Sequence, residues 1–212
     1  MAISRAALAS ALGLACSTCG DPDAPPVEDT SSPGAPIAVP NDLVIAPGSV
    51  AGVAAGDTLA DFRTAMGEKP LEFIPSYRGD LSALCLLEAE DRAVCAITWA
   101  AEQEQPAAEI ELLQVFSPRF TTEAGIGPGD PIDEAIAAYG PALFSFSKEN
   151  ENREYVEFDR GPEAVSFRPV RATGADGFAG VYDDMDRIAP TTQSYHADAR
   201  IEIIEVVRPI AP

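Results

Sequence analysis

Two segments of the chain repeat one another, and this internal repeat constrains the fold more than any other feature of the sequence. Residues 52–67 read GVAAGDTLADFRTAMG and residues 125–140 read GIGPGDPIDEAIAAYG, with five identical positions out of sixteen. A second match follows each segment, because residues 110–118 (IELLQVFSP) correspond to residues 201–209 (IEIIEVVRP) with four identities. Self-similarity at two points in the same order is typical of a duplicated structural unit. We therefore expect a tandem repeat of one module.

Each repeated segment has the pattern of a short helix. Asp57 and Asp130 occupy positions typical of a helix N-cap, Pro131 suits the first helical position, and Gly67 and Gly140 follow as C-terminal caps. Between these signals, apolar residues recur at helical spacing and give each helix one face to bury. These apolar residues are Leu59, Phe62, Met66, Ile132, Ala135, Ile136 and Tyr139.

Apolar runs of strand length follow each helix, separated by short loops that are typical of antiparallel hairpins. The predicted strands cover residues 71–77, 81–87, 94–99 and 110–116, then 143–147, 153–158, 164–170 and 200–207. The predicted fold class is α+β, a tandem duplication of a module in which a short helix packs on a small antiparallel β-sheet of about four strands. The first repeat is expected over residues 41–120 and the second over residues 121–212.

The repeated pattern also resembles a known module. Residues 52–70 and 125–141 share the form G-x-x-x-G-D-x-hydrophobic, a short helix, and a glycine with a proline shortly before the next strand. This form resembles the repeat of the β-lactamase inhibitory protein and of the small outer-membrane assembly lipoproteins of the SmpA/OmlA type. The resemblance implies a helical lead-in packed on an antiparallel sheet and a tendency to bind proteins. It concerns the shape of the module and assigns no contact residue.

The N-terminus has the pattern of an export signal. A positively charged start with Arg5 precedes an apolar run over residues 6–15, which is too short to span a bilayer. The run ends at Leu14-Ala15-Cys16, which resembles the lipobox of bacterial lipoproteins, although Gly13 stands where leucine is usual. The resemblance implies a signal peptide over residues 1–15 and lipidation of Cys16 in a membrane-anchored envelope lipoprotein. Ordinary signal cleavage and an uncleaved apolar segment are the open alternatives.

The segment after Cys16 has the composition of a tether. Residues 20–40 contain six prolines, four acidic residues and no basic residue. Such a segment buries too little apolar area to offset the entropy lost on ordering. We therefore expect an extended, disordered tether over residues 16–40.

Two further cysteines lie symmetrically about an acidic turn. Cys85 and Cys95 flank residues 88–91, and in an exported protein such a pair can form a cross-strand disulfide. The strand register stays open, because the second repeat favours a register that would place the two cysteines on opposite faces. The alternative is a pair of buried free thiols. Cys16 and Cys19 spell C-x-x-C outside any βαβ context, which argues against a redox motif.

The single histidine, His196, raises the alternative of an envelope hydrolase. It has Ser194 and Asp198 as neighbours inside the segment of residues 172–199. The two sequence matches are offset by 73 (125 − 52) and 91 (201 − 110) positions, so the second repeat carries an insertion of about eighteen residues (91 − 73) there. Adjacency in sequence does not bring nucleophile, base and acid together, so we favour a solvated loop histidine and no catalytic residue.

The same insertion contains weak candidates for calcium ligands. Asp183, Asp184 and Asp186 lie close together, with Asp176 nearby, so that a Ca²⁺-stabilised surface protein is a further alternative. The cluster lacks the spacing and the distal glutamate of an EF-hand loop. One histidine also leaves no zinc-type ligand set. An exposed acidic loop is the favoured interpretation, and neither a metal nor another cofactor is predicted.

Charge narrows the class of partner. The whole chain has a formal net charge of −20, and removal of the signal with Arg5 gives −21 (−20 − 1). Such a chain is repelled by phosphate backbones, so nucleic acid is excluded as a partner. Lys69 and Lys148 are the only lysines in the sequence, and this usage is typical of a GC-rich bacterial genome. We therefore predict an acidic, exported protein that binds another envelope protein, or acts as a scaffold, without catalysis.

Overall fold

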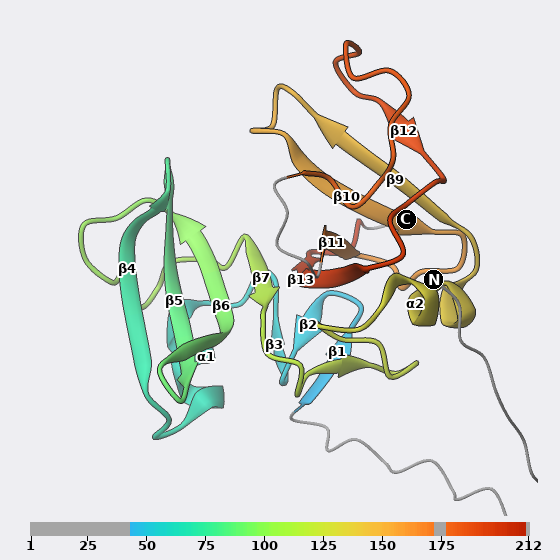
Figure 1. The fold of residues 1–212 in the computed structure, drawn as a ribbon. Helices are drawn as coiled ribbons and strands as arrows, with labels where there is room; N and C mark the ends of the chain where they lie inside the picture. The colour runs from blue at the N-terminus through green and yellow to red at the C-terminus, as the bar shows by residue number, and fades with distance from the viewer. Residues whose placement is uncertain (1–42, 172–176, 211–212) are drawn as a thin grey trace, which may run out of the picture. The chain divides into compact units, whose positions relative to one another are not determined.

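The computed structural model describes residues 43–171 and 177–210, which belong to one compact unit over Ala38–Pro212. The predicted signal peptide, the predicted tether, Cys16 and Cys19 lie outside the described residues. The described chain is α+β and mainly β, because two short helices accompany strands that pair almost entirely antiparallel (Figure 1).

Both predicted helices are present, as α1 over Leu59–Met66 and α2 over Ile132–Tyr139. Their N-caps differ from the prediction. Thr58 caps α1 in a capping box, in which its hydroxyl accepts from the backbone N of Asp61 at 3.3 Å. Pro131 stands at the N-cap of α2, not at its first position, and makes no side-chain cap. No helix in the described part of the chain is long and apolar enough to cross a membrane.

The two predicted capping aspartates instead close the turn before each helix. Asp57 and Asp130 each accept a hydrogen bond at Oδ2 from the backbone N–H three residues earlier, at 2.8 Å and 2.7 Å. The preceding glycines have positive φ in both copies, 106° at Gly56 and 94° at Gly129. Residues with a side chain rarely adopt a positive φ, so glycine is favoured at these two positions. The shared Gly-Asp pair therefore specifies a turn rather than a helix cap.

Nine strands form one large sheet in the order β12-β9-β10-β11-β13-β7-β6-β5-β4. Their bounds are Leu71–Arg78 (β4), Leu81–Glu88 (β5), Asp91–Trp99 (β6), Leu112–Val115 (β7), Ala142–Ser147 (β9), Arg153–Phe158 (β10), Val165–Arg171 (β11), Thr191–Thr192 (β12) and Ala199–Val207 (β13). The antiparallel pair β7–β13 joins the strands that follow α1 to those that follow α2. The two small sheets expected from the sequence are thus parts of one sheet.

A second, small sheet was not predicted from the sequence. It has the order β3-β2-β1-β8, with bounds Val53–Ala54 (β3), Ser49–Val50 (β2), Val44–Ala46 (β1) and Thr121–Thr122 (β8). β1 and β8 pair in parallel, so a strand that precedes the first repeated segment pairs with one that precedes the second. These strands are two or three residues long, which is too short for a pattern of alternation to reveal.

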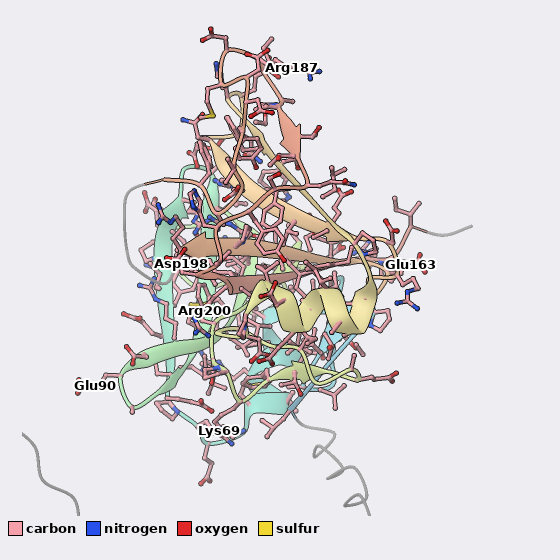
Figure 2. All side chains as sticks on the ribbon, turned by 45° about the vertical axis from the view of Figure 1, so that its right-hand side comes forward. Lys69, Glu90, Glu163, Arg187, Asp198 and Arg200 are labelled. Carbon is pink, nitrogen blue, oxygen red and sulfur yellow. A yellow bond between two sulfur atoms is a disulfide. The ribbon has the colours of Figure 1, made fainter. Side chains whose placement is uncertain are left out.

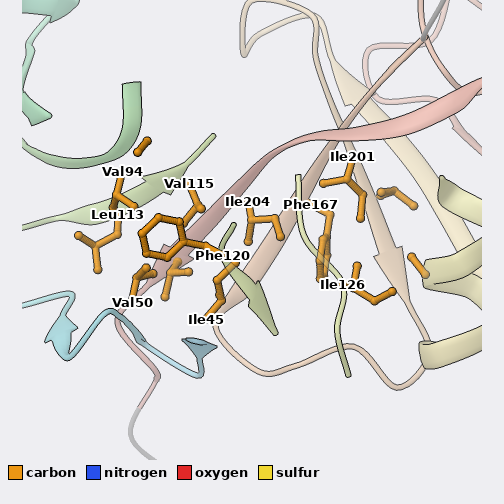
Figure 3. Packing of buried hydrophobic residues seen from close by; sticks show 14 of the residues in the cluster. Ile45, Val50, Val94, Leu113, Val115, Phe120, Ile126, Phe167, Ile201 and Ile204 are labelled. Atoms are coloured by element: carbon orange, nitrogen blue, oxygen red, sulfur yellow. The ribbon is translucent and has the colours of Figure 1, made fainter. Parts of the chain in front are cut away.

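One hydrophobic core serves both halves of the chain. It contains the buried faces of α1 and α2, the inner residues of the small sheet and one face of the large sheet. Figure 3 shows its centre, where Phe120 and Ile45 lie beside Val115 and Ile204 of the joining strands. Because the same cluster contains residues from both repeats, neither half is expected to be stable alone.

The opposite face of the large sheet, which we call the outer face, carries the predicted disulfide. Cys85 of β5 and Cys95 of β6 are directly paired, with 4.0 Å between their Cα atoms, and their sulfur atoms are bonded. They form a small apolar cluster with Ala83 and Ile97. The register therefore places both cysteines on one face, against the register suggested by the second repeat.

Candidate functional site

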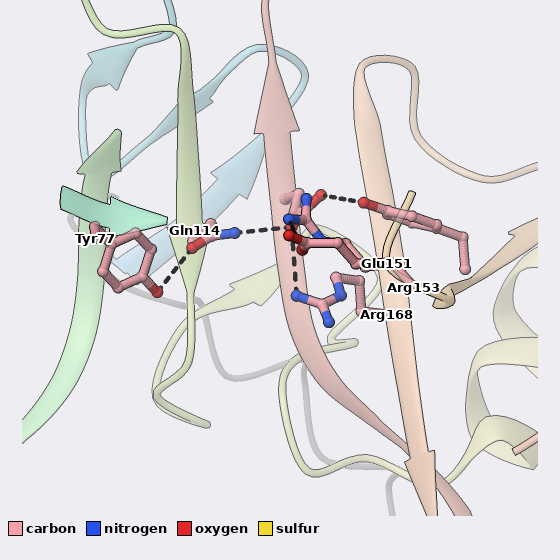
Figure 4. Close-up of polar contacts among 7 residues, drawn as sticks. Tyr77, Gln114, Glu151, Arg153 and Arg168 are labelled. Atoms are coloured by element: carbon pink, nitrogen blue, oxygen red, sulfur yellow. Dashed lines mark hydrogen bonds and ion pairs between the residues drawn. The ribbon is translucent and has the colours of Figure 1, made fainter. Parts of the chain in front are cut away.

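Polar side chains connected by hydrogen bonds and one ion pair cross the outer face. We call Tyr77, Gln114, Glu205, Tyr155 and Arg168 the polar row. Figure 4 labels Tyr77, Gln114 and Arg168 of this row. Tyr77 Oη donates to Gln114 Oε1 at 3.1 Å, and Gln114 Nε2 donates to Glu205 Oε1 at 2.8 Å. Tyr155 Oη donates to Glu205 Oε2 at 3.1 Å. The row runs over β4, β7, β13, β10 and β11, so it links both halves of the sheet.

The centre of the polar row lies on the line where the two halves meet. Gln114 of β7 and Glu205 of β13 are directly opposite one another in the ladder. Each stands between two apolar residues that point into the core, so strand alternation directs both polar side chains to the outer face. The two residues also occupy the same position in the repeated segments 110–118 and 201–209.

Two members of the polar row are almost fully buried. Gln114 is 3% exposed and Glu205 is 7% exposed, so unmade hydrogen bonds there would be costly. Burial raises the pKa of Tyr155, and the neighbouring Glu205 carboxylate raises this pKa further. Tyr155 therefore stays a neutral donor at physiological pH. Arg168 Nη1 lies 3.8 Å from Glu205 Oε1, which is an ion pair without a hydrogen bond.

Tyr77 reaches the row because strand β4 bends. The β4–β5 register shifts between Ile74 and Arg78, and Ser76 has a φ of 52°. Guanidinium carbons of Arg78 and Arg92 lie 5.4 and 5.5 Å from the centre of the Tyr77 ring, which is within cation–π range. The irregular strand thus places an aromatic ring near two cations at one end of the row.

On the core face, Glu154 of β10 anchors part of the predicted insertion. Its carboxylate accepts from the backbone N of Ala179 at 2.6 Å, the backbone N of Gly180 at 2.8 Å and Tyr182 Oη at 2.7 Å. Burial raises the pKa of Glu154 although these hydrogen bonds oppose the rise, and burial beside this carboxylate raises the pKa of Tyr182. The site is structural, because its acceptor oxygens are already used.

Among the described residues, the contacts of Ser194, His196 and Asp198 go to different partners. Asp198 forms an ion pair with Arg171 across β11 and β13, with Nε and Oδ1 3.5 Å apart. The backbone of Ser194 bonds to Val181 and to the Thr192 hydroxyl, which fixes a turn. His196 donates its backbone N–H to the carbonyl of Ala179. The backbone contacts of this segment close a loop.

The calcium candidates lie on an exposed turn. Asp183, Asp184 and Asp186 are exposed, and Asp184 Oδ1 accepts from the backbone N of Asp186 at 3.0 Å. Asp176 lies outside the described residues. Within residues 43–171 and 177–210, no group of three or more acidic, cysteine or histidine side chains is placed to hold a metal ion. Other charged residues, such as Lys69, Glu90, Glu163 and Arg187, likewise lie in loops (Figure 2).

The polar row was missed in the sequence, although one signal pointed to it. Within the matched segments, Gln114 and Glu205 are polar residues set between apolar neighbours at equivalent positions. Tyr155 and Arg168 carried no comparable signal, because half-buried strands often hold such residues on their solvent side. The contact of Tyr77 depends on an irregular strand, which the sequence did not reveal.

Comparison with known proteins gives little further information. No family model matches the sequence, and no curated protein matches it. Among solved structures, the uncharacterized protein yfeY from Escherichia coli is similar, with a TM-score of 0.49 and 11% sequence identity. The similarity covers 78% of this chain and 99% of that chain. At this level it carries no conclusion about function.

Proposed function

We propose that this chain is an exported protein of the bacterial cell envelope, anchored by lipid on Cys16, whose folded part binds another envelope protein without catalysis. The supporting observation is the outer face, where exposed apolar side chains accompany the polar row. Trp99 is 64% exposed at the end of β6, and Leu143 and Val207 are also exposed. Alternation along their strands places all three on this face. Exposed apolar groups combined with tyrosine and arginine characterise protein interfaces.

The charge of the chain favours a partner with a basic contact surface. A net charge of −20 attracts cationic surfaces over long range and repels anionic ones. Capture of the partner should therefore weaken as the salt concentration rises.

We also propose that the two halves derive from duplication of one module. The matched segments support this, and so do the equivalent turns closed by Asp57 and Asp130 and the antiparallel meeting of equivalent residues at Gln114 and Glu205. Replacing residues 52–67 by the sequence of residues 125–140 should leave a cooperatively folded protein. Loss of the near-ultraviolet circular dichroism signal in that chimera would count against equivalence of the two segments.

Affinity capture tests the binding function. The tagged full-length protein, chemically cross-linked in its source cells, should retain one saturable partner. Trp99→Ala should reduce the yield of this partner, whereas Ile188→Ala, which truncates an exposed apolar residue in the insertion, should not. Equal yields from the two variants would contradict a role for the outer face, and absence of any saturable partner would contradict the function.

Metabolic labelling tests the anchor. An alkyne-bearing palmitate analogue should label the wild-type protein, and Cys16→Ser should lose the label and accumulate in the soluble fraction. Cys19→Ser is the matched control and should keep both the label and the membrane association. Labelling that persists in Cys16→Ser would rule out Cys16 as the lipidated residue.

A further inference from the structure

Strands β10 and β11 are neighbours in the sheet but are poorly paired. They share one registered pair, Val156 and Phe167, whereas β9–β10 and β11–β13 are paired along their strands. Beyond this pair, a hollow of about 330 Å³ opens between the start of β10 and the end of β11. Pro169 of β11 lines it and has no N–H to offer to a ladder. The volume is that of a small-molecule site.

Arg168 lines this hollow with unused hydrogen-bond donors. Its side chain is only 15% exposed, and its Nε and Nη1 atoms are buried. Neither atom has a hydrogen-bond partner among the described residues. The Glu205 carboxylate is 3.8 Å from Nη1, and its two oxygens already accept from Gln114 and Tyr155. A buried guanidinium with unmade bonds is costly, so a ligand that accepts from it gains affinity.

A second cation lies at the same opening. Arg153 of β10 lines the hollow; its Nη2 is 2.5 Å from Glu151 Oε2, and Tyr155 is a second hydrogen-bond partner of its guanidinium. Glu154 and Glu151 also line the hollow, and Glu205 lies behind Arg168. These acids limit the positive charge of the site, so a singly charged anion suits it better than a multiply charged phosphate.

The other end of the hollow is apolar. Phe178 lines it and stacks on Phe146, with ring centres 4.0 Å apart, while the Tyr182 ring meets Phe178 edge-on at 5.5 Å. Val170 and Pro169 complete this part of the lining. An aromatic cluster of this kind offers contact area to an apolar group.

We propose that this hollow binds a small molecule that has one carboxylate and a short apolar or aromatic tail. The carboxylate accepts hydrogen bonds from Arg168 and is attracted by Arg153, and the tail lies against Phe178. The site shares Arg168 with the polar row, but it uses none of the exposed apolar side chains Trp99, Leu143 and Val207 that support partner binding, so each proposal can fail without the other.

Titration of the full-length protein with sodium benzoate tests this site, with benzamide as the neutral isostere. Calorimetry should give saturable benzoate binding with a dissociation constant below about 5 mM. The Nε–H resonance of Arg168 should shift with the same midpoint in nuclear magnetic resonance spectra, and benzamide should bind at least about tenfold more weakly.

Three variants assign the contact. Arg168→Lys keeps a cation beside Glu205 but loses the fork of donors, so it should weaken benzoate binding about tenfold or more. Phe178→Leu should weaken benzoate binding and leave acetate binding unchanged. Arg92→Gln, at the Tyr77 ring and outside the lining of the hollow, should leave both unchanged. Absence of saturable binding up to about 20 mM, undiminished binding by folded Arg168→Lys, or tighter binding of inorganic phosphate than of benzoate would each overturn the proposal.

Discussion

The Glu154 carboxylate ties strand β10 to the segment around residue 180 by three hydrogen bonds, and its energetic role depends on pH. Burial raises its folded-state pKa above the ordinary value of 4.5. A raised carboxyl pKa means that folding favours the protonated form of Glu154. The stability linked to this protonation is complete below the unfolded pKa and is lost as the pH rises through the folded pKa.

Glu154→Gln tests this pH dependence. The variant cannot titrate, and its amide NH₂ only donates where the hydroxyl oxygen of the protonated carboxyl can still accept, so its unfolding free energy should be lower by about 1–3 kcal/mol at low pH. The deficit relative to wild type should shrink as the pH rises above the ordinary glutamate pKa of 4.5 and through the raised folded-state pKa. Urea unfolding of both proteins at several pH values measures this deficit. Glu157→Gln, on the exposed side of the same strand, is the control and should show no such trend; a deficit that grows with pH would contradict the account.

The disulfide between Cys85 and Cys95 should contribute measurably to stability. It closes a loop with a sequence separation of 10, and such a loop constrains the unfolded chain. The double variant Cys85→Ala/Cys95→Ala should therefore lose about 2–3 kcal/mol of unfolding free energy. Wild type and variant can be compared by urea unfolding without reductant. An unchanged midpoint would show that the bond is absent or energetically silent.

Elements differ in how strongly their ends are fixed, and the two helices provide a matched pair. Thr58 caps α1 through a capping box, whereas Pro131 at the start of α2 makes no side-chain cap. Thr58→Ala should therefore reduce the unfolding free energy by about 1 kcal/mol. Thr64→Ala, on the exposed side of the same helix, is the control for helix propensity. Equal losses in both variants would argue against the cap.

The long strands and both helices could be predicted from the sequence, because their apolar residues recur over six or more positions. Pairing between the halves could not be predicted, since strands β7 and β13 lie far apart in the sequence. The polar row was missed for the same reason, because its members come from five strands. The Gly-Asp turn was misread as a cap, since aspartate suits both roles.

At the scale of the whole molecule, the two halves are expected to unfold together because they share one core. Ile204 of β13 is fully buried where the halves meet. Ile204→Ala should lower the unfolding free energy by about 2–5 kcal/mol and preserve a single transition. Ile188→Ala, at an exposed site, should change it by less than about 0.5 kcal/mol. Two separate calorimetric transitions would show that the halves fold independently.

Site-specific photo-crosslinking in the source cells tests the proposed binding function most directly. A photoreactive amino acid at Glu157 would lie on the outer face, and the same residue at Ala65 would lie on the exposed side of α1. We expect irradiation to give one discrete crosslinked envelope protein from position 157 and none from position 65. Crosslinks from position 65 but not 157, or none from either position, would contradict a function for the outer face.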